Sequence, residues 1–406
     1  MSTHDEIDGT SPGAGEHAVR GGVTGPGGFR ASGVAAGIKQ GSSADLALVV
    51  NDGPRREAAG LFTTNKVKAA PVLWSEQVLR ERRLHAVVLN SGGANACTGP
   101  EGFQDTHATA EKVAEELGIG AIDVAVCSTG LIGQRLPMDA VRSGVPVAVA
   151  GLADSERAAT DAATAVLTTD TGPKQAFREH GAGFSVGGMV KGAGMIAPNL
   201  ATMLAVVTTD AVVDGDTLNA ALRQAAGTTF ERLDVDGGTS TNDTVLLLSS
   251  GASGVAPEAG ELTELLTETC NDLVRQLQYD AEGATKAVDI TVRGTLRESD
   301  AVHLARLVAE DNLVCTALFG SDPNWGRIAM AVGRSDVEMD AHRMEIAANG
   351  VTLYSEGTPV VDRSEVDLSG REIEIVIDLG LGEHETTVLT TDLSHGYVEE
   401  NSAYSS

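Results

Sequence analysis

The sequence contains few aromatic residues and few cysteines. Phe, Trp and Tyr make up 3% of the 406 residues, so a core must be built mainly from Val, Leu, Ile and Ala. The four cysteines lie far apart and form no CxxC pair: Cys97, Cys127, Cys270 and Cys315. This spacing gives no support to a zinc site or a disulfide scaffold, and it is typical of reduced, buried thiols in a cytoplasmic protein.

Basic residues and long apolar runs are also scarce. The chain has 29 Lys and Arg against 57 Asp and Glu, which gives a formal net charge of -28. A field of that sign repels phosphate backbones and anionic membranes, so we expect no nucleic-acid partner and no membrane partner. No apolar run reaches the roughly 18 residues of a membrane span, and the first residues lack the features of a signal peptide. We therefore expect a cytoplasmic protein.

Several familiar catalytic motifs match in letters but fail in context. Residues 183–187 read G-x-S-x-G, but a nucleophile elbow needs a helix after the serine, and glycines follow here. Residues 192–197 resemble a dinucleotide fingerprint, but Pro198 interrupts the helix that such a fingerprint requires. The nine histidines show no HExxH or HxH pairing, so we expect no metal bound by histidines.

The acidic loop at residues 234–243 resembles a calcium-binding loop. An EF-hand would require an acidic residue at 238 and a glutamate at 245, where this chain has Gly238 and Val245. We interpret the carboxylates as acceptors for loop amides. One non-enzymatic alternative remains open, an acidic binding protein that holds a cation with Asp234, Asp236 and Asp243.

Apolar runs alternate with amphipathic segments along the chain. Strands are expected at 45–50, 61–64, 85–89, 124–127, 204–207, 244–248, 288–292, near 337, 344–348 and 373–377. Helices are expected at 73–83, 105–117 with Asp105 as the cap, 154–167, 217–230, 261–277 and 300–309. This alternation predicts an α/β or α+β protein with layered sheets and helices, after a flexible segment at residues 1–25.

The stretch from Val190 to Asp210 is the most unusual one. Glycines crowd its approach, Pro198 stiffens its middle, and Thr202 precedes an apolar run at 204–207 that reads as a buried strand. A threonine in this place is either an ordinary strand-start residue or a buried nucleophile that becomes a chain terminus. The residues alone leave both interpretations open.

Long segments in the expected order make one resemblance specific. The sequence resembles the bifunctional glutamate N-acetyltransferase/ornithine acetyltransferase family of arginine biosynthesis. The resemblance extends from about residue 28 to the last residue. The matching segments are VKGAGMIAPNLATMLAVVTTDA, LNSGGANACTG, VCSTGLIG, TTD at 168, FERLDVDGGTSTNDTVLLLSSG, DAEGATK, ALFGSDPNWGRI and TTDLSHGYVEENSAYSS.

The resemblance implies a fold shared with self-cleaving aminopeptidases and similar to, but distinct from, that of the Ntn hydrolases. It also implies self-cleavage between Ala201 and Thr202, which would give an alpha chain at 26–201 and a beta chain at 202–406 in an α2β2 heterotetramer. The cut would leave Thr202 with a free α-amine whose pKa is about 7.7–8.0. That amine could act as the base that a threonine hydroxyl needs.

The same resemblance implies acetyl transfer from N2-acetylornithine to Thr202 and then to glutamate. It assigns Thr129 and Gly130 to the oxyanion hole, and it leaves Cys127 as a packing residue. The implied substrate-binding residues are Thr168, Thr169, Lys191, Thr202, Glu282, Asn401 and Ser406. No cofactor is implied, and acetyl-CoA stays open as a co-substrate. The alternative enzyme is a self-cleaving aminopeptidase or amidase that uses water as the acceptor.

Overall fold

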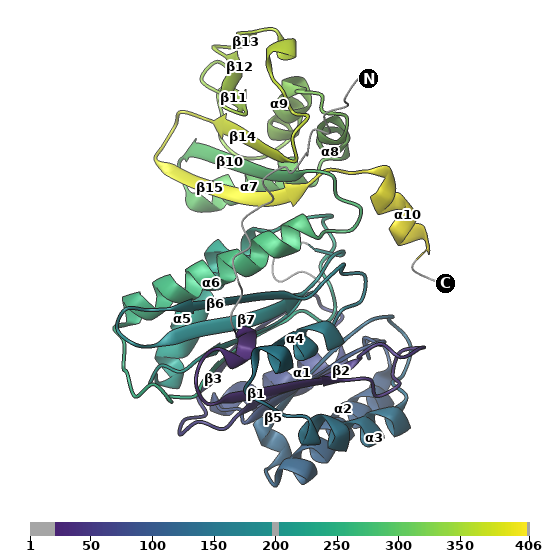
Figure 1. The fold of residues 1–406 in the computed structure, drawn as a ribbon. Coiled ribbons are helices and arrows are strands. Elements are labelled where there is room, and N and C mark those ends of the chain that lie inside the picture. The colour runs from purple at the N-terminus through teal and green to yellow at the C-terminus, as the bar shows by residue number, and fades with distance from the viewer. Residues whose placement is uncertain (1–20, 197–202, 404–406) are drawn as a thin grey trace, which may run out of the picture.

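The computed structural model of the protein describes residues 21–196 and 203–403. Ala201, Thr202 and Ser406 therefore lie outside the described residues, as does most of the expected flexible segment 1–25. The described chain forms three sheets with helices packed on them (Figure 1). This arrangement confirms the predicted class of layered sheets and helices.

The first sheet is the four-stranded one near the N-terminus. Its strands, in spatial order, are β1 (Phe29–Val34), β2 (Leu46–Asn51), β4 (Ala86–Ser91) and β5 (Val124–Thr129). Only β4 and β5 pair in parallel. The helices packed against this sheet are α1 (Ala70–Val78), α2 (Gly99–Leu117), α3 (Met138–Ala150) and α4 (Glu156–Ala165).

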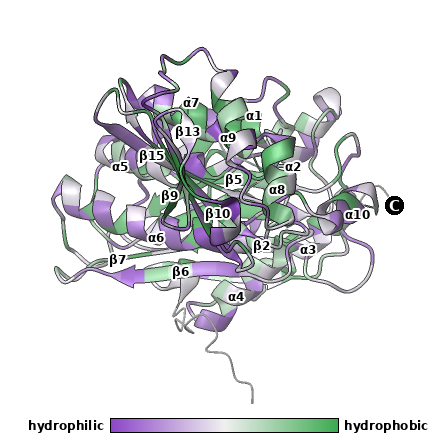
Figure 2. Ribbon diagram, turned by 90° about the horizontal axis from the view of Figure 1, so that it is seen from above, coloured by the Kyte–Doolittle hydropathy of each residue, from purple (hydrophilic) through white to green (hydrophobic). Residues whose placement is uncertain are grey.

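The second sheet has five strands and carries the apolar run after Thr202. Its order is β3 (Ala58–Phe62), β9 (Thr244–Ser249), β8 (Leu204–Thr209), β7 (Ser185–Lys191) and β6 (Lys174–Glu179). Helices α5 (Gly215–Thr228) and α6 (Ala259–Tyr279) pack against it. Figure 2 shows hydrophilic residues along edge strand β6 and alternating hydropathy along α6.

The first four residues of strand β8 are all apolar because both faces of the strand are buried. Leu204 and Val206 belong to the core shared with the first sheet, whereas Ala205 and Val207 belong to the core under α5 and α6. Successive side chains of a strand point to opposite faces, so a strand between two cores needs a continuous apolar run. The sequence signal at 204–207 is therefore that of a central strand in a middle layer.

The third sheet forms a separate body with its own core, at the top of Figure 1. Its order is β13 (Thr358–Pro359), β12 (Val351–Ser355), β11 (Glu345–Ala348), β14 (Glu372–Asp378), β10 (Ala287–Thr295) and β15 (His384–Thr391). Its helices are α7 (Glu298–Ala309), α8 (Asn312–Phe319) and α9 (Trp325–Gly333). After β15 the chain leaves this body, and α10 (His395–Ala403) extends toward the other two sheets (Figure 1).

Two expected helix starts differ from the structure. The helix expected at 73–83 begins at Ala70, because Pro71 suits a first turn, and it ends at Val78. Asp105, the expected cap, lies inside α2. Its buried carboxylate accepts two hydrogen bonds from Arg135 at 2.8 Å, so it anchors a loop and caps nothing.

Some elements escaped the sequence analysis. Helices α3, α8 and α9 and strand β6 were not expected, whereas Val337, expected near a strand, lies in the irregular segment after α9. Gly187 and Gly188, two of the glycines that crowd the approach to Thr202, belong to the fully buried strand β7. A Cβ at Gly187 would lie 2.0 Å from the carbonyl oxygen of Gly22, so glycine is needed where another backbone crosses the strand.

That crossing segment is η1 (Gly22–Thr24), a short 3-10 turn whose residues are buried. Residues 22–24, which the sequence places in the expected flexible segment, therefore form a buried turn. The rejection of the two glycine motifs is also consistent with the structure. Ser185 begins a strand, and residues 192–196 contain no helix.

Cys127 packs in the core of the first sheet, as expected, and burial raises the pKa of its thiol to about 12. Cys270 and Cys315 are likewise buried free thiols, whereas Cys97 is exposed. Across residues 21–196 and 203–403, no helix combines the length and the apolar character needed to cross a membrane.

Candidate active site

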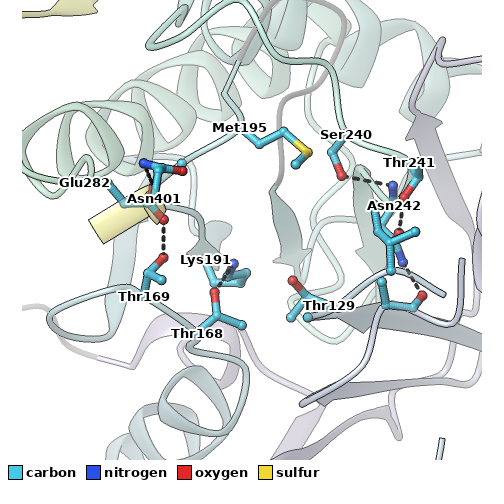
Figure 3. A pocket seen from close by; sticks show the side chains of 14 residues that line it. Thr129, Thr168, Thr169, Lys191, Met195, Ser240, Thr241, Asn242, Glu282 and Asn401 are labelled. Atoms are coloured by element: carbon cyan, nitrogen blue, oxygen red, sulfur yellow. Dashed lines mark hydrogen bonds between the residues drawn. The ribbon is translucent and has the colours of Figure 1, made fainter. Parts of the chain in front are cut away.

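One pocket collects every candidate site residue that lies in the described chain (Figure 3). It forms where the carboxyl end of β5, the end of β7, the loops after α4 and α6, and helix α10 meet. The candidates that line it are Thr129, Gly130, Thr168, Thr169, Lys191, Glu282 and Asn401. The other lining residues are Ala94, Ile132, Gly194, Met195, Ser240, Thr241 and Asn242.

Thr129 and Gly130 stand at the end of β5. The Gly93 N–H donates to the Thr129 carbonyl at 3.0 Å, which brings the 92–94 loop against this strand end. Gly130 has a φ of +134°, and a Cβ there would lie 2.5 Å from the Gly93 nitrogen. Both the conformation and the close approach require glycine. The strand end is thus held in one conformation, with the Thr129 side chain toward the pocket (Figure 3).

Lys191 ends β7 and is buried at the pocket. Its Nζ donates to Thr168 Oγ1 at 2.7 Å and lies 3.7 Å from an Asp170 carboxylate oxygen. Burial lowers the pKa of Lys191, and the nearby Asp170 opposes that shift. The pocket therefore contains a largely desolvated lysine side chain, whose ammonium form can bind a carboxylate much more strongly than a surface lysine can.

Asp170 was not among the predicted site residues. It also pairs with Lys174 at 2.7 Å and accepts the Gly192 N–H at 2.7 Å. Burial alone would raise the pKa of Asp170, but the two lysines and this amide together hold it well below its usual range. In the sequence, Asp170 appears only as the last residue of the matching segment TTD at 168, of which the resemblance assigns the two threonines to substrate binding.

Glu282 is held by donors from distant parts of the chain. Thr169 Oγ1 donates to one carboxylate oxygen at 2.7 Å, and Asn401 Nδ2 donates to the other at 2.8 Å. The Glu282 N–H donates to the Ala193 carbonyl at 2.8 Å. Gly194 is needed beside it, since a Cβ at that position would lie 2.1 Å from Glu282 Oε2. The carboxylate is fixed in orientation at the pocket, opposite in charge to Lys191.

The wall formed by Ser240, Thr241 and Asn242 was not predicted. Asn242 Nδ2 donates to the carbonyls of Ala94 at 2.6 Å and Ser128 at 2.8 Å. These bonds join the second sheet to the strand end that carries Thr129. In the sequence this segment belongs to the loop that resembles a calcium-binding loop and to one of the matching segments, and neither assigns it a role.

The acidic loop braces backbone amides, as interpreted from the sequence. Asp234 accepts the Gly237 N–H at 3.1 Å, and Asp236 accepts the Met195 N–H at 2.7 Å. Asp243 accepts the Met203 N–H at 3.3 Å. Among the described residues its other oxygen has no hydrogen-bond donor, and burial raises the pKa of Asp243 well above its usual value. This carboxyl group lies beside the first described residue after Thr202.

The sequence was compared with known proteins. Residues 30–406 match the ArgJ family. The arginine biosynthesis bifunctional protein ArgJ of Mycolicibacterium paratuberculosis is 59% identical over 390 residues, which cover 95% of this chain and 96% of that protein. The protein of the same name from Mycobacterium tuberculosis is 57% identical with the same coverage, and that from Streptomyces coelicolor is 55% identical over 384 residues, 95% of this chain and 100% of its own.

A solved structure of an ornithine acetyltransferase from Mycobacterium tuberculosis, in complex with ornithine, is 58% identical. It covers 45% of this chain and 96% of its own, with a TM-score of 0.44. The match of residues 30–406 and the identity of the three relatives decide the family. The chain belongs to the ArgJ family of acyltransferases in arginine biosynthesis.

Proposed function

We propose that the chain transfers the acetyl group of N2-acetylornithine to glutamate through an acetyl ester on Thr202. The observation that carries the proposal is a pocket in which a buried ammonium, Lys191, and a fixed carboxylate, Glu282, occur together. N2-acetylornithine carries one carboxylate and one ammonium, so its two charges match these two side chains. In a protein of net charge -28, a local cation is needed to hold any substrate carboxylate.

The nucleophile in this proposal is the hydroxyl of Thr202, freed by self-cleavage after Ala201. Its own α-amine takes the hydroxyl proton while Oγ bonds to the acetyl carbon. The bond from that carbon to the α-nitrogen of ornithine then breaks, and the nitrogen receives the proton. In the second half-reaction the glutamate amine bonds to the acetyl carbon, the ester bond breaks, and the Thr202 oxygen regains a proton.

Thr129 and Gly130 are proposed to stabilise the oxyanion of both half-reactions. Their support is position, because both line the pocket at a strand end held by glycine contacts. A fixed donor aimed at a developing oxyanion typically contributes about 2.7–4 kcal/mol to lowering the barrier. Three further residues are proposed to act through Lys191 and Glu282. Thr168 accepts a hydrogen bond from Lys191, and Thr169 and Asn401 donate hydrogen bonds to Glu282. Ser406, outside the described residues, is retained as a further substrate contact.

Two alternatives lose support from the family assignment. A self-cleaving aminopeptidase or amidase would use water as the acceptor, but the sequence matches ArgJ proteins over nearly its whole length. The alternative function, a non-enzymatic cation-binding protein, is wrong because this family consists of enzymes. Its expected cation ligands, Asp234, Asp236 and Asp243, accept hydrogen bonds from backbone N–H groups.

The remaining parts of the proposal concern assembly and location. We propose chains 26–201 and 202–406 that stay associated as an α2β2 heterotetramer in the cytoplasm. The transfer needs no cofactor. Acetyl-CoA is the second acetyl donor to assay, because the relatives are named bifunctional. Formation of N-acetylglutamate from acetyl-CoA and glutamate would assign both activities to this chain.

The test is Thr202→Ala, examined on a denaturing gel, by N-terminal sequencing and in an acetyl-transfer assay. The wild-type protein should give two bands of near-equal size, one of which begins Thr-Met-Leu-Ala, and it should transfer acetyl groups from N2-acetylornithine to glutamate. Thr202→Ala should stay uncut at 41.7 kDa and should be inactive.

Thr202→Ser is the matched control, because it keeps a hydroxyl at the same atom position. It should still cleave and should retain part of the transferase activity. Cleavage or acetyl transfer by Thr202→Ala would refute the assignment of the nucleophile. Release of free acetate in place of N-acetylglutamate by the wild type would favour the hydrolase alternative.

A further inference from the structure

Helix α10 contributes Asn401 to the pocket although it buries no residue of its own. Its apolar content is small, and Val398 is 59% exposed. Burial of apolar surface therefore cannot explain why the helix stays docked. Polar contacts, together with an edge-on contact between the rings of His395 and Phe319, hold it in place.

The first contact lies at the start of the helix. Ser394 Oγ donates to the Gly283 carbonyl at 2.5 Å, and the Tyr397 N–H donates back to Ser394 Oγ at 3.0 Å. Gly283 has a φ of +60°, and a Cβ there would lie 2.1 Å from the Tyr397 nitrogen. The helix start thus lies directly on the loop that presents Glu282.

The second contact joins the helix to the other wall of the pocket. Tyr397 donates its hydroxyl hydrogen to Asp236 Oδ2 at 3.1 Å. The same oxygen accepts the N–H of Met195 at 2.7 Å, and Asp236 Oδ1 accepts the Gly238 N–H at 3.1 Å. Met195 lines the pocket and has a φ of +56°, a left-handed conformation that costs energy for a residue other than glycine. The Asp236 carboxylate holds the Met195 backbone in this conformation.

Tyr397 keeps its proton throughout the neutral range. Burial, followed by the charge of Asp236, raises the pKa of its hydroxyl above the ordinary value. The phenol is therefore a permanent donor to the carboxylate, and a hydrogen bond to a charged group is stronger than one between neutral groups.

We propose that Tyr397 is a positioning residue that clamps helix α10 onto the pocket through Asp236. The clamp joins two walls, one with Asn401 and Glu282 and the other with Gly194 and Met195. This inference rests on the proposed function, since the pocket it shapes is the proposed acetylornithine site. Tyr397 itself does not line the pocket, so its effect must pass through these neighbours.

The test is Tyr397→Phe, which removes one hydroxyl and keeps the ring. We expect the KM for N2-acetylornithine to rise about tenfold, which corresponds to about 1.4 kcal/mol, because Asn401 and Glu282 lose their fixed geometry. We expect kcat to change less than about twofold, because Tyr397 contacts no reacting atom. Amide hydrogen exchange should become faster at residues 192–196 and 395–403, most directly at the Met195 N–H.

Tyr354→Phe is the matched control. It removes the hydroxyl of a largely buried tyrosine in β12, whose partner is the Ala341 carbonyl at 2.9 Å, remote from the pocket. Kinetics and exchange at 192–196 and 395–403 should equal those of the wild type in this variant.

The two readouts separate failure of the clamp from failure of the proposed function. If the wild type transfers no acetyl group, the proposed function fails, while hydrogen exchange still tests the clamp. Unchanged exchange in Tyr397→Phe overturns the clamp, whatever the kinetics show. Faster exchange with an unchanged KM overturns the connection between the clamp and the pocket.

Discussion

At the scale of single residues, the buried ammonium of Lys191 is the feature that most constrains the chemistry. Moving an amine out of water has a large desolvation cost, and the Thr168 hydroxyl and the charges of Asp170 and Glu282 offset part of it. Asp170 lies 3.7 Å from Lys191 Nζ and is shared with Lys174, so a substrate carboxylate would add a closer anionic partner. This arrangement favours anion binding over a purely structural ion pair.

We predict that Lys191→Met will lower kcat/KM for N2-acetylornithine by roughly 10- to 100-fold, the effect of losing one or two charge-assisted hydrogen bonds. Methionine keeps most of the stem volume, and Asp170 retains its bond to Lys174, so the fold should persist. Steady-state kinetics measure the loss of activity, and a circular dichroism spectrum checks that the fold persists.

Lys66→Met is the control, because Lys66 is an exposed lysine outside the pocket. Its kinetics should match the wild type. Equal activity in Lys191→Met would mean that the substrate carboxylate binds elsewhere.

Some residues of the pocket could be predicted from the sequence, and others could not. Thr129, Lys191 and Glu282 were named because the resemblance assigns them roles, and the structure brings them into one pocket. Asp170 and Tyr397 were missed, because each acts through a contact with a residue far away in the chain. A single sequence carries no mark of such contacts.

At the scale of elements, strand β7 shows how two layers meet. Gly187 lies where η1 crosses the strand. Gly188 lies where α6 packs closely, since a Cβ at Gly188 would be 3.0 Å from a methyl carbon of Leu273. Glycine weakens a strand, since it has no side chain to pack and loses much conformational freedom on folding. The close crossing of another backbone compensates for that loss.

We predict opposite effects for two glycine-to-alanine substitutions. Gly187→Ala should destabilise the protein by about 1–3 kcal/mol, because the new methyl meets the Gly22 backbone and not a movable side chain. Gly227→Ala should stabilise it by about 0.5–1 kcal/mol, because Gly227 lies in α5 with open space around its Cα. Urea unfolding curves measure both changes.

The pair is its own control, since both variants add one methyl group. Destabilisation by Gly227→Ala would contradict the open space around its Cα. Stabilisation by Gly187→Ala would show that η1 can move away from the strand.

Elements were predictable where their pattern is local. Strands β8 and β9 were found from their apolar runs, and α6 from its helical period. β7 was missed because its glycines indicate a loop unless the crossing at Gly22 is known. α8 and α9 were missed because their patterns are short and interrupted by the turn at 320–324.

At the scale of the whole molecule, the pocket lies where separate layers converge. The first sheet supplies Thr129, the second supplies Lys191, and the helix that follows the third sheet supplies Asn401. The contributing segments span most of the described sequence, so local pattern could not predict the constellation. Its formation requires the three sheets to be docked together.

The charge of the whole molecule sets a long-range field on every substrate. The net charge of -28 repels anions, whereas the buried Lys191 attracts them only at short range. Glutamate carries a net charge of about -1 at neutral pH, and N2-acetylornithine is close to neutral because its carboxylate and ammonium cancel. The two substrates should therefore respond differently to salt.

We predict that kcat/KM for glutamate will rise about twofold or more between 0.01 M and 0.1 M ionic strength, as the screening length shrinks from about 30 Å to about 10 Å. The value for N2-acetylornithine should change much less. Initial rates are measured at each ionic strength with one substrate varied and the other saturating, which gives the salt dependence of kcat/KM for each substrate. N2-acetylornithine, which is close to neutral, is the internal control. A fall for glutamate on adding salt would mean that the ammonium groups near the pocket, and not the total charge, dominate the potential that the substrate meets.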